Sequence, residues 1–259
     1  MIRRFRTYLA PRPVKPQAAV PEGQRVYAVG DIHGRRDLFE KLIALIEADD
    51  AARGPAETTV ILLGDLIDRG PESAGVVDAA RAWGERRRVR AIAGNHEEML
   101  LKSFERIDTL RHFLRYGGRE TVLSYPISDS LYEQMSYEEL QAFLPELIPA
   151  EHIAYFEAME DRIAIGDYVF VHAGIRPGVA MDDQKISDLR WIRETFIDDS
   201  RDHGVVVVHG HTISHEVEER PNRIGIDTGA FMSGRLTALG LEGTSRWYLT
   251  AREANAPAG

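Results

Sequence analysis

Five short polar blocks, each near the end of a predicted β-strand, contain the residues in this chain that could perform chemistry. They are GDIHG at residues 30–34, GDLIDRG at 64–70, GNHE at 94–97, HAG at 172–174 and GHT at 210–212. Aspartate, asparagine and histidine supply the oxygen and nitrogen ligands that divalent metal ions bind. Pairs of such ions commonly hydrolyse phosphate esters. The order of the blocks therefore predicts a dinuclear metal site that acts on a phosphorylated substrate.

The blocks supply two carboxylates and a set of neutral ligands. Asp31 and His33 are separated by one residue just after a strand, so both side chains can point to one side, and Asp65 follows the next strand. One carboxylate can bridge two metal ions, which then lie about 3.5–4 Å apart. Neutral ligands come from Asn95, His172 and His211. Two divalent ions held by only two carboxylates keep a positive charge, which attracts a phosphoryl group and favours a bound hydroxide.

Three further residues in these blocks could act on the substrate. His96 follows Asn95 directly, so it can face the substrate while Asn95 faces the metal. Asp68 could accept a hydrogen bond from His96 and favour its protonated form, which would make His96 a general acid for the leaving group. Arg69 can bind phosphate oxygens through a bidentate fork that lysine cannot form.

The elements that position these blocks are predicted to alternate between strand and helix. Short apolar runs lie at residues 26–29, 59–63, 89–93, 168–171 and 205–208. Apolar residues at helical spacing separate the first three runs, which indicates βαβ units. Asp31, Asp65 and Asn95 lie 34 and 30 residues apart, the length of such a unit. Ligands gather at the carboxyl ends of strands in βαβ folds, so we expect the chemistry at one edge.

The remaining sequence patterns predict a helical insertion and a group of antiparallel strands near the C-terminus. Residues 98–162 have helical spacing and read as a helical insertion, which either packs against the sheet or forms a wall over the site. Closely spaced strand-like runs at 223–226, 235–241 and 246–249 indicate antiparallel pairing and a mixed sheet system. We expect a catalytic domain at 25–250, a disordered, basic and proline-rich leader at 1–24, and a flexible tail at 251–259.

Composition excludes several classes of protein. The 259 residues are 44% hydrophobic, which suffices for a sizeable core. The chain has no cysteine, so disulfides, thiolate nucleophiles and sulfur-ligated metals are excluded. A formal net charge of −9 argues against bulk nucleic-acid binding. No stretch is long enough to span a membrane, and the N-terminus lacks the apolar region of a signal peptide. We expect a cytoplasmic protein.

Together the blocks resemble the calcineurin-like metallophosphoesterase superfamily, specifically its bacterial and phage phosphoprotein phosphatases of the Ser/Thr type. The resemblance runs from residue 25 to residue 241. It implies an α/β fold with a sandwich of two mixed β-sheets flanked by helices, instead of the single doubly wound sheet that spacing suggests. It implies a first metal ion on Asp31, His33 and Asp65, and a second on Asp65, Asn95, His172 and His211. Manganese is the expected metal, with iron, zinc or cobalt as alternatives.

The same resemblance implies roles for the remaining site residues. His96 and Asp68 would form the acid pair, while Arg69 and Asn95 would contact the phosphate. Arg193 lies in WIRE at 191–194, which is similar to a stretch whose arginine also contacts phosphate. IDTGA at 226–230 is typical of the bacterial branch. His209 stands where many relatives carry an apolar residue, which suggests a place behind the ligands. The remaining histidines fit no block and are expected at the surface: His112, His152, His203 and His215.

The resemblance leaves alternative functions open. The main interpretation is a phosphomonoesterase acting on phosphoserine or phosphothreonine, with phosphotyrosine also considered, in a protein or peptide. The alternative is a symmetrical diadenosine tetraphosphatase. That group shares the Gly70-Pro71 pair but typically lacks the carboxylate of Asp68 and carries aspartate in place of Glu97. A non-catalytic scaffold of the same fold is a third possibility, disfavoured because every ligand position is filled.

Overall fold

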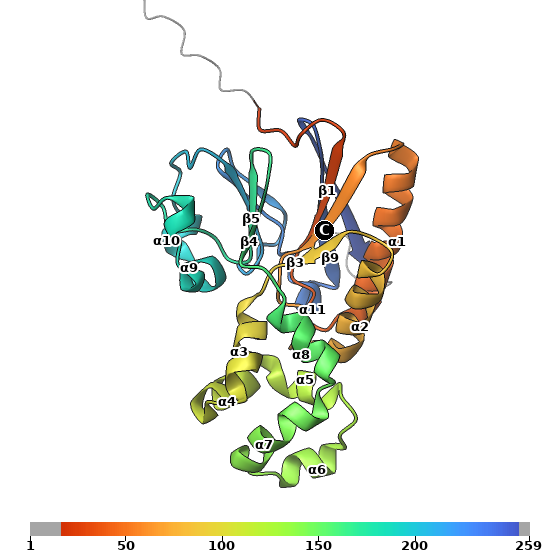
Figure 1. Ribbon diagram of the computed structural model, residues 1–259, viewed down its shortest axis with the longest axis vertical. Coiled ribbons are helices and arrows are strands. Elements are labelled where there is room, and N and C mark those ends of the chain that lie inside the picture. Colours follow the sequence, from red (N-terminus) through yellow and green to blue (C-terminus); the bar gives the residue numbers. More distant parts are fainter. Residues whose placement is uncertain (1–16, 254–259) are drawn as a thin grey trace, which may run out of the picture.

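Two five-stranded β-sheets face each other in the computed structural model of the protein, which describes residues 17–253 (Figure 1). Helices cover the outer faces of both sheets, and a separate group of helices extends below them. Each sheet contains both parallel and antiparallel pairs. The expected sandwich of two mixed sheets is therefore confirmed.

The first sheet carries the first three sequence blocks. Its strands lie in the order β10 (Ser245–Arg252), β9 (Arg235–Glu242), β1 (Gln24–Val29), β2 (Glu57–Leu62) and β3 (Val89–Ala91). β1, β2 and β3 are parallel, whereas β9 runs antiparallel to β1. Side chains alternate along β1 as the pleat requires: Val26 and Ala28 pack between the sheets, and Tyr27 and Val29 pack in the other core cluster, with α1 and α2 residues. The carboxyl ends of β1, β2 and β3 thus meet at one edge.

The second sheet carries the two later blocks. Its strands lie in the order β4 (Arg162–Ile165), β5 (Tyr168–Val171), β6 (Val206–His209), β8 (Arg223–Gly225) and β7 (Glu218–Glu219). β5, β6 and β8 are parallel, and the edge strands β4 and β7 pair antiparallel. The two edge strands are missing from the sequence prediction because neither carries a sustained apolar run. The parallel core of the sheet places its ligands at the same edge as the first.

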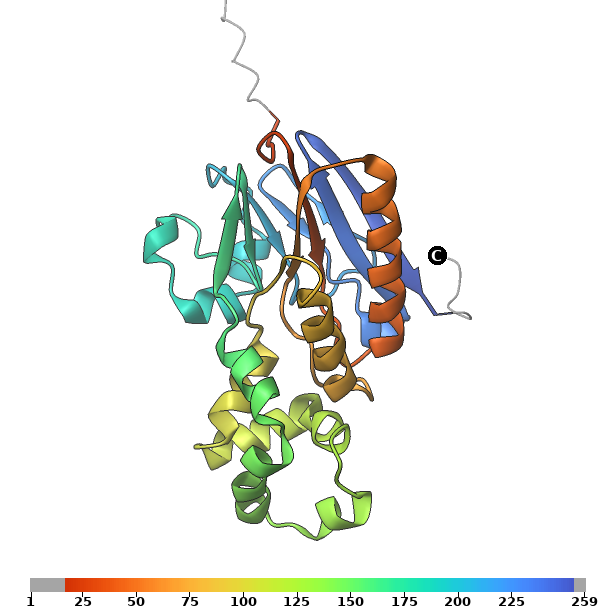
Figure 2. The same ribbon diagram turned by 45° about the vertical axis from the view of Figure 1, so that its right-hand side comes forward.

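Helices α1 (Arg36–Arg53) and α2 (Ser73–Gly84) cover the outer face of the first sheet (Figure 2). α9 (Ile186–Trp191) and α10 (Glu194–Ile197) pack on the outer face of the second sheet through Leu189 and Phe196. Two short helices remain: η2 (Met181–Asp183) and α11 (Ala230–Ser233). The central strands of both sheets are therefore buried on both faces, whereas the edge strands β4, β7 and β10 are partly exposed.

The lower group of helices, here called the helical lobe, lies where the sequence predicts an insertion (Figure 1). It comprises α3 (Asn95–Ser103), α4 (Ile107–Phe113), the kinked turn η1 (Leu114–Gly118), α5 (Arg119–Leu123), α6 (Asp129–Gln134), α7 (Tyr137–Leu147) and α8 (Ala150–Glu157). Its apolar residues belong to the same core cluster as α1 and α2. The lobe therefore packs onto the first half of the domain and is not an independent unit.

The structure differs from the predicted boundaries at both ends. The leader was expected to include residue 24, but β1 begins there, and Val20 is buried with its N–H donating to the Gly243 carbonyl at 2.9 Å. The tail was expected from residue 251, but β10 continues to Arg252 and Ala251 is buried. Pairing with the β9–β10 hairpin orders both segments. Residues 1–16 and 254–259 lie outside the described part of the chain.

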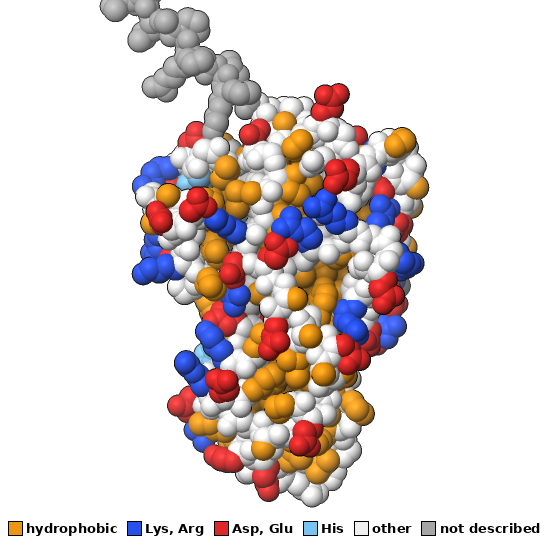
Figure 3. Space-filling view, in the orientation of Figure 1, with side chains coloured by type: hydrophobic (Ala, Val, Ile, Leu, Met, Phe, Trp, Pro, Cys, Tyr) orange, Lys and Arg blue, Asp and Glu red, His pale blue; other side chains and the backbone are white. Residues whose placement is uncertain are grey.

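Within residues 17–253, no helix is long and apolar enough to cross a membrane. On the face of the molecule shown in Figure 3, acidic and basic side chains are interspersed. Many charged side chains among the described residues form ion pairs, such as Arg88 with Glu57 at 2.6 Å.

Candidate active site

The two sheets bring the predicted residues to one edge of the sandwich, above the helical lobe. Each block lies at the carboxyl end of a strand: Asp31 and His33 after β1, Asp65, Asp68 and Arg69 after β2, Asn95 and His96 at the start of α3, His172 after β5, and His211 after β6. The exposed fraction of every one of these side chains except that of Arg69 is at most 6%. Residues up to 180 positions apart in sequence therefore form one buried polar cluster.

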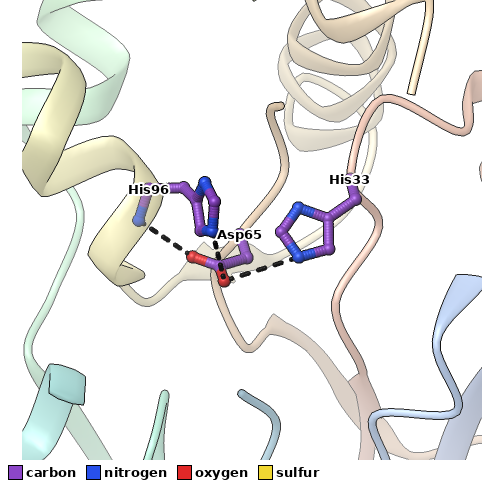
Figure 4. Close-up of side chains that lie close together, drawn as sticks. All are labelled: His33, Asp65 and His96. Atoms are coloured by element: carbon purple, nitrogen blue, oxygen red, sulfur yellow. Dashed lines mark hydrogen bonds and ion pairs between the residues drawn. The ribbon is translucent and has the colours of Figure 1, made fainter. Parts of the chain in front are cut away.

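Asp65 is at the centre of the cluster (Figure 4). Its Oδ2 lies 3.6 Å from His33 Nε2, 3.8 Å from His96 Nε2 and 3.4 Å from His172 Nε2. Two groups of side chains are close enough to hold a metal ion, His33 with Asp65 and His96, and Asp65 with His172 and His211. Because Asp65 belongs to both groups, its carboxylate is placed as a bridging ligand would be.

Backbone carbonyls orient two of the imidazoles. The Nδ1 of His33 lies 2.8 Å from the Ile67 carbonyl, and the Nδ1 of His172 lies 2.8 Å from the Leu63 carbonyl. An Nδ1–H that donates to a carbonyl leaves the Nε2 lone pair facing the cluster, as in many protein metal sites. The Nε2 of His211 is buried and has no hydrogen-bond partner within the described residues. These atoms suit a metal ion.

The electrostatics of the ligands also fit divalent cations. Burial lowers the pKa of His33 to about 3, and burial, aided by the charges of His172 and Arg193, lowers the pKa of His211 to about 2. Both imidazoles are therefore neutral at pH 7, the form that binds metal. Burial, together with the neighbouring carboxylates of Asp227 and Asp65, raises the pKa of Asp31 well above its usual value. Bound cations would relieve that penalty.

Asp31 is held against the last block. Both of its carboxylate oxygens accept the backbone N–H of His211, at 3.0 and 3.2 Å. A Cβ on Gly210 would overlap Asp31 Oδ1, and a Cβ on Gly94 would overlap Asp65 Oδ1. Glycine is thus required in these two blocks because the carboxylates approach the backbone closely.

His96 and Asp68, which the sequence predicts as an acid pair, lie in hydrogen-bond contact. The Nδ1 of His96 lies 2.5 Å from Asp68 Oδ2, and both residues are buried. Burial alone would lower the pKa of His96, but the carboxylates of Asp65 and Asp68 outweigh it and raise the pKa. The Nε2 of the same ring lies 3.0 Å from a guanidinium nitrogen of Arg69. His96 therefore presents Nε2 beside a cation that can bind phosphate.

Backbone strain is concentrated in this cluster. Among residues 17–253, the non-glycine residues with positive φ all belong to the predicted site: His33, Asp65, Asp68, Arg69 and His211. Such conformations cost on the order of 1–3 kcal/mol each and persist where the surrounding structure enforces them. The strained residues therefore coincide with the edge at which the sequence predicts the site.

The two predicted arginines differ in their surroundings. The guanidinium of Arg69 lies 4.8 Å from the centre of the Phe231 ring, which also packs edge-on against His33. Arg193 is exposed just before α10, and its guanidinium has no hydrogen-bond or ion-pair partner among the described residues. Its charge nevertheless acts on His211. Arg193 is therefore near the cluster and free to bind an anion.

Sequence reasoning missed several residues that support the site. Glu97 accepts the backbone N–H groups of Asp65, Leu66 and Gly94 at 2.7–3.0 Å, so it fixes the loop after β2. Asp227 is buried beside Asp31 with one carboxylate oxygen unpartnered, and burial raises its pKa to about 6. The sequence could have indicated Asp227, because the IDTGA segment follows a strand as the other blocks do.

The structure corrects the predicted surface position of one of the remaining histidines. His152, expected at the surface, is buried between the Tyr125 hydroxyl at 3.0 Å and Asp78 at 2.9 Å. Its position in α8, facing the core of the lobe, explains the burial. His209 is buried in β6, beyond the ligand groups, with its ring against Phe196.

Residues 24–230 match the family model of the calcineurin-like phosphoesterases. The chain therefore belongs to the calcineurin-like phosphoesterase family. A symmetrical bis(5'-nucleosyl)-tetraphosphatase of Chromohalobacter salexigens is 31% identical over 184 residues, which cover 66% of this chain and 65% of that protein. Serine/threonine-protein phosphatase 1 of Salmonella typhimurium is 27% identical over 238 residues, covering 88% of this chain and 97% of that protein.

The relatives differ in how much of their length is matched. The chain spans 45% of the symmetrical tetraphosphatase of Delftia acidovorans, at 30% identity. Among solved structures, a candidate diadenosine tetraphosphatase has a TM-score of 0.61 at 22% identity, with 92% of this chain and 100% of that chain covered. The cold-active protein-tyrosine phosphatase of a psychrophilic Shewanella has a TM-score of 0.53 at 18% identity, with 89% and 83% covered. These structures support the fold.

Proposed function

We propose that the chain is a metal-dependent hydrolase of phosphoric esters or anhydrides, with the buried cluster as its active site. Asp31, His33 and Asp65 would hold one divalent ion, and Asp65, Asn95, His172 and His211 a second, with manganese as the first choice. Such ions, when bound, supply a hydroxide nucleophile near neutral pH. The observation that carries the proposal is the convergence of neutral imidazole nitrogens on the shared carboxylate of Asp65.

The protein's own groups then bind the substrate and move a proton. Arg69, Arg193 and the Asn95 amide would bind the phosphate oxygens. Protonated His96 would donate from Nε2 to the leaving oxygen, while its Nδ1–H stays hydrogen-bonded to Asp68. Because Arg69 lies beside His96 Nε2, the bound phosphate and the proton donor would be adjacent.

For the substrate, we propose a dinucleoside tetraphosphate hydrolysed symmetrically. The curated relatives named above favour this alternative over the phosphoprotein interpretation, which is not confirmed. In the sequence, Glu97 is a difference from the tetraphosphatases. In the structure, the Glu97 carboxylate binds backbone N–H groups of the loops after β2 and β3. Glu97 therefore stabilises these loops, and its identity says little about which substrate the protein prefers.

A surface pocket of about 440 Å³ supports a nucleotide substrate. It is lined in part by Lys102, Arg106, His112 and Trp191. The Trp191 indole is 38% exposed and is fixed by its N–H donating to Glu98 at 3.0 Å. Glu98 and Trp191, which line the pocket, lie two residues from His96 and Arg193 in the sequence, and the carboxylates of Glu98 and Asp108 also belong to its lining. Aromatic rings stack on bases, and cations attract polyphosphate.

A phosphoprotein substrate is the second candidate, and the acid pair favours it. An alkoxide leaving from phosphoserine is strongly basic and needs a proton, whereas a nucleoside diphosphate leaves readily as an anion. The intact His96–Asp68 pair, at 2.5 Å, is thus of greatest use on a phosphomonoester. The Salmonella phosphatase, aligned over 97% of its length, points the same way.

Parallel kinetics would decide between the two. The full chain with Mn²⁺ is assayed on diadenosine tetraphosphate and on a phosphoserine peptide, and nucleotide products are separated by chromatography. We expect kcat/KM at least tenfold higher on the dinucleotide, with ADP as the only product. A higher value on the peptide would select the second candidate, and AMP plus ATP would contradict symmetrical cleavage. A protein that binds no metal and hydrolyses neither substrate nor an aryl phosphate would revive the scaffold.

A further inference from the structure

The helical lobe contacts the proposed acid pair from behind through Thr121 of α5. This side chain is fully buried, and its hydroxyl lies 2.6 Å from Asp68 Oδ1. A carboxylate can only accept, so the single hydroxyl proton of Thr121 is directed to Asp68. The other carboxylate oxygen, Oδ2, is the one that faces His96. Both oxygens of Asp68 are therefore fixed, one by the lobe and one by the acid.

The same hydroxyl also holds the backbone of Asp68. Thr121 Oγ1 accepts the Asp68 N–H at 2.8 Å, and the hydroxyl of Ser73 accepts that N–H at 3.0 Å. Asp68 has a φ of 73°, a left-handed conformation that a residue with a side chain adopts only under local constraint. Removing the hydroxyl would free both the strained backbone and the carboxylate.

The neighbouring turn of the lobe holds the next residue. The carbonyl of Gly117 accepts the N–H of Arg69 at 3.0 Å, and a Cβ on Gly117 would overlap the Arg69 backbone. Two consecutive active-site residues, Asp68 and Arg69, are thus bound by the segment 117–121. The lobe is positioned to support the proton donor directly, in addition to any contact with substrate.

We infer that Thr121 is a positioning residue for general acid catalysis: its hydroxyl orients Asp68 so that the Asp68 carboxylate orients His96 toward the leaving oxygen. The inference rests on the proposed role of His96 as the acid. It does not depend on whether the substrate is a dinucleotide or a phosphopeptide, because the contacts lie behind His96. The proton transferred is the one on His96 Nε2, and Thr121 keeps its own.

The test compares leaving groups. Thr121→Val keeps the shape of the side chain and removes the hydroxyl, whereas Thr121→Ser keeps the hydroxyl. Each variant is assayed with Mn²⁺ on p-nitrophenyl phosphate, whose leaving group needs little protonation, and on phenyl phosphate, whose leaving group is as basic as tyrosine, with a pKa of about 10. We expect Thr121→Val to lower kcat about tenfold on phenyl phosphate, an effect typical of orienting partners, and less than about twofold on p-nitrophenyl phosphate. Thr121→Ser should restore most of the loss.

Two control variants keep the outcomes separate. Ser103→Ala removes another fully buried hydroxyl of the lobe and measures the general cost of such a loss, through thermal unfolding and both assays. His96→Asn should show a steeper dependence on the leaving group than Thr121→Val. If His96→Asn shows none, the acid assignment itself fails. If His96→Asn shows this dependence on the leaving group but Thr121→Val lowers kcat equally on both substrates, or on neither, the positioning role of Thr121 is overturned.

Discussion

Two clusters of charged residues, one partly and one fully buried, lie at opposite ends of the first sheet and differ in how their charges are compensated. At the amino end of β1, Arg25 is buried and pairs with Asp50 at 2.7 Å, and Arg87 pairs with the other oxygen of Asp50 at 2.6 Å. We call Arg25, Asp50 and Arg87 the arginine cluster. At the carboxyl end, Asp31 and Asp65 face imidazoles and another carboxylate. Asp50 is bound by two arginines, whereas Asp31 is bound by no cationic side chain among the described residues and has two carboxylates nearby.

The pKa values express this contrast in two aspartates of one domain. Burial would raise the pKa of Asp50, but hydrogen bonds from Thr58, Arg25 and Arg87 outweigh it and lower the pKa. Burial raises the pKa of Asp31, and neighbouring Asp227 and Asp65 add to the effect. Buried charges without partners are destabilising and are retained mainly where they serve function. The contrast therefore teaches that local charge imbalance, together with deeper burial, distinguishes the candidate site from a structural ion-pair cluster.

The largest expected effect concerns turnover. On phenyl phosphate, whose leaving group needs a proton, His96→Asn should lower kcat by about 10²–10⁴-fold, the usual contribution of a general acid, while metal content measured by atomic emission stays near that of the unchanged chain. Arg87→Ala in the arginine cluster is the matched control and should leave kcat within about twofold. Wild-type turnover in His96→Asn would show that the proton comes from elsewhere.

The next effect concerns stabilisation by metal. At a Mn²⁺ concentration of 100 times Kd, binding should stabilise the chain by about 2.7 kcal/mol. Asp65→Asn, which weakens both proposed ion sites, should abolish most of that gain, whereas Asp50→Asn should retain it in full. The measurement is thermal unfolding with and without Mn²⁺. An equal gain in Asp65→Asn would contradict its placement as the shared ligand.

Much of the site could be predicted from sequence because its ligands are local to recognisable blocks. Asp31 and Asp65 closely follow a strand and His96 lies in the first turn of the helix after β3, so residue type and spacing were informative. Thr121 was not predictable, because its contact with Asp68 spans 53 residues and depends on how α5 packs. The orienting role of Glu97 was missed for a related reason: its carboxylate binds backbone N–H groups, which no side-chain pattern reveals.

The fold shows the same division. The central strands were predicted because apolar runs mark strands that are buried on both faces. β4 and β7 were missed because edge strands need no such run, and the burial of Val20 was missed because it depends on the distant β9–β10 hairpin. The pairing of two sheets, finally, came from resemblance and not from spacing.

A smaller effect, with opposite signs at the two clusters, is expected in the metal-free protein. Asp50→Asn leaves Arg25 and Arg87 short of a counter-charge and should lower the free energy of unfolding by about 1–3 kcal/mol. Asp31→Asn removes an unfavourable buried charge yet can still accept the His211 N–H, so it should raise the free energy of unfolding, on the order of 1 kcal/mol. Urea denaturation in the presence of a chelator measures both. Destabilisation by both variants would remove the distinction between the clusters.

The smallest effect is the pH dependence of those two differences. The pKa of Asp50 is lowered by folding, so its contribution is complete above the unfolded value of about 3.9 and is lost as the pH falls through the folded value. The pKa of Asp31 is raised, so its penalty is present at pH 7 and is relieved as the pH falls. Between pH 7 and pH 4, wild type should therefore approach Asp31→Asn from below, while its advantage over Asp50→Asn stays nearly constant and shrinks only at lower pH. Urea titrations of the metal-free proteins at several pH values would show this, and an advantage over Asp50→Asn that already disappeared between pH 7 and pH 5 would mean that Asp50 is not held ionised by its arginines.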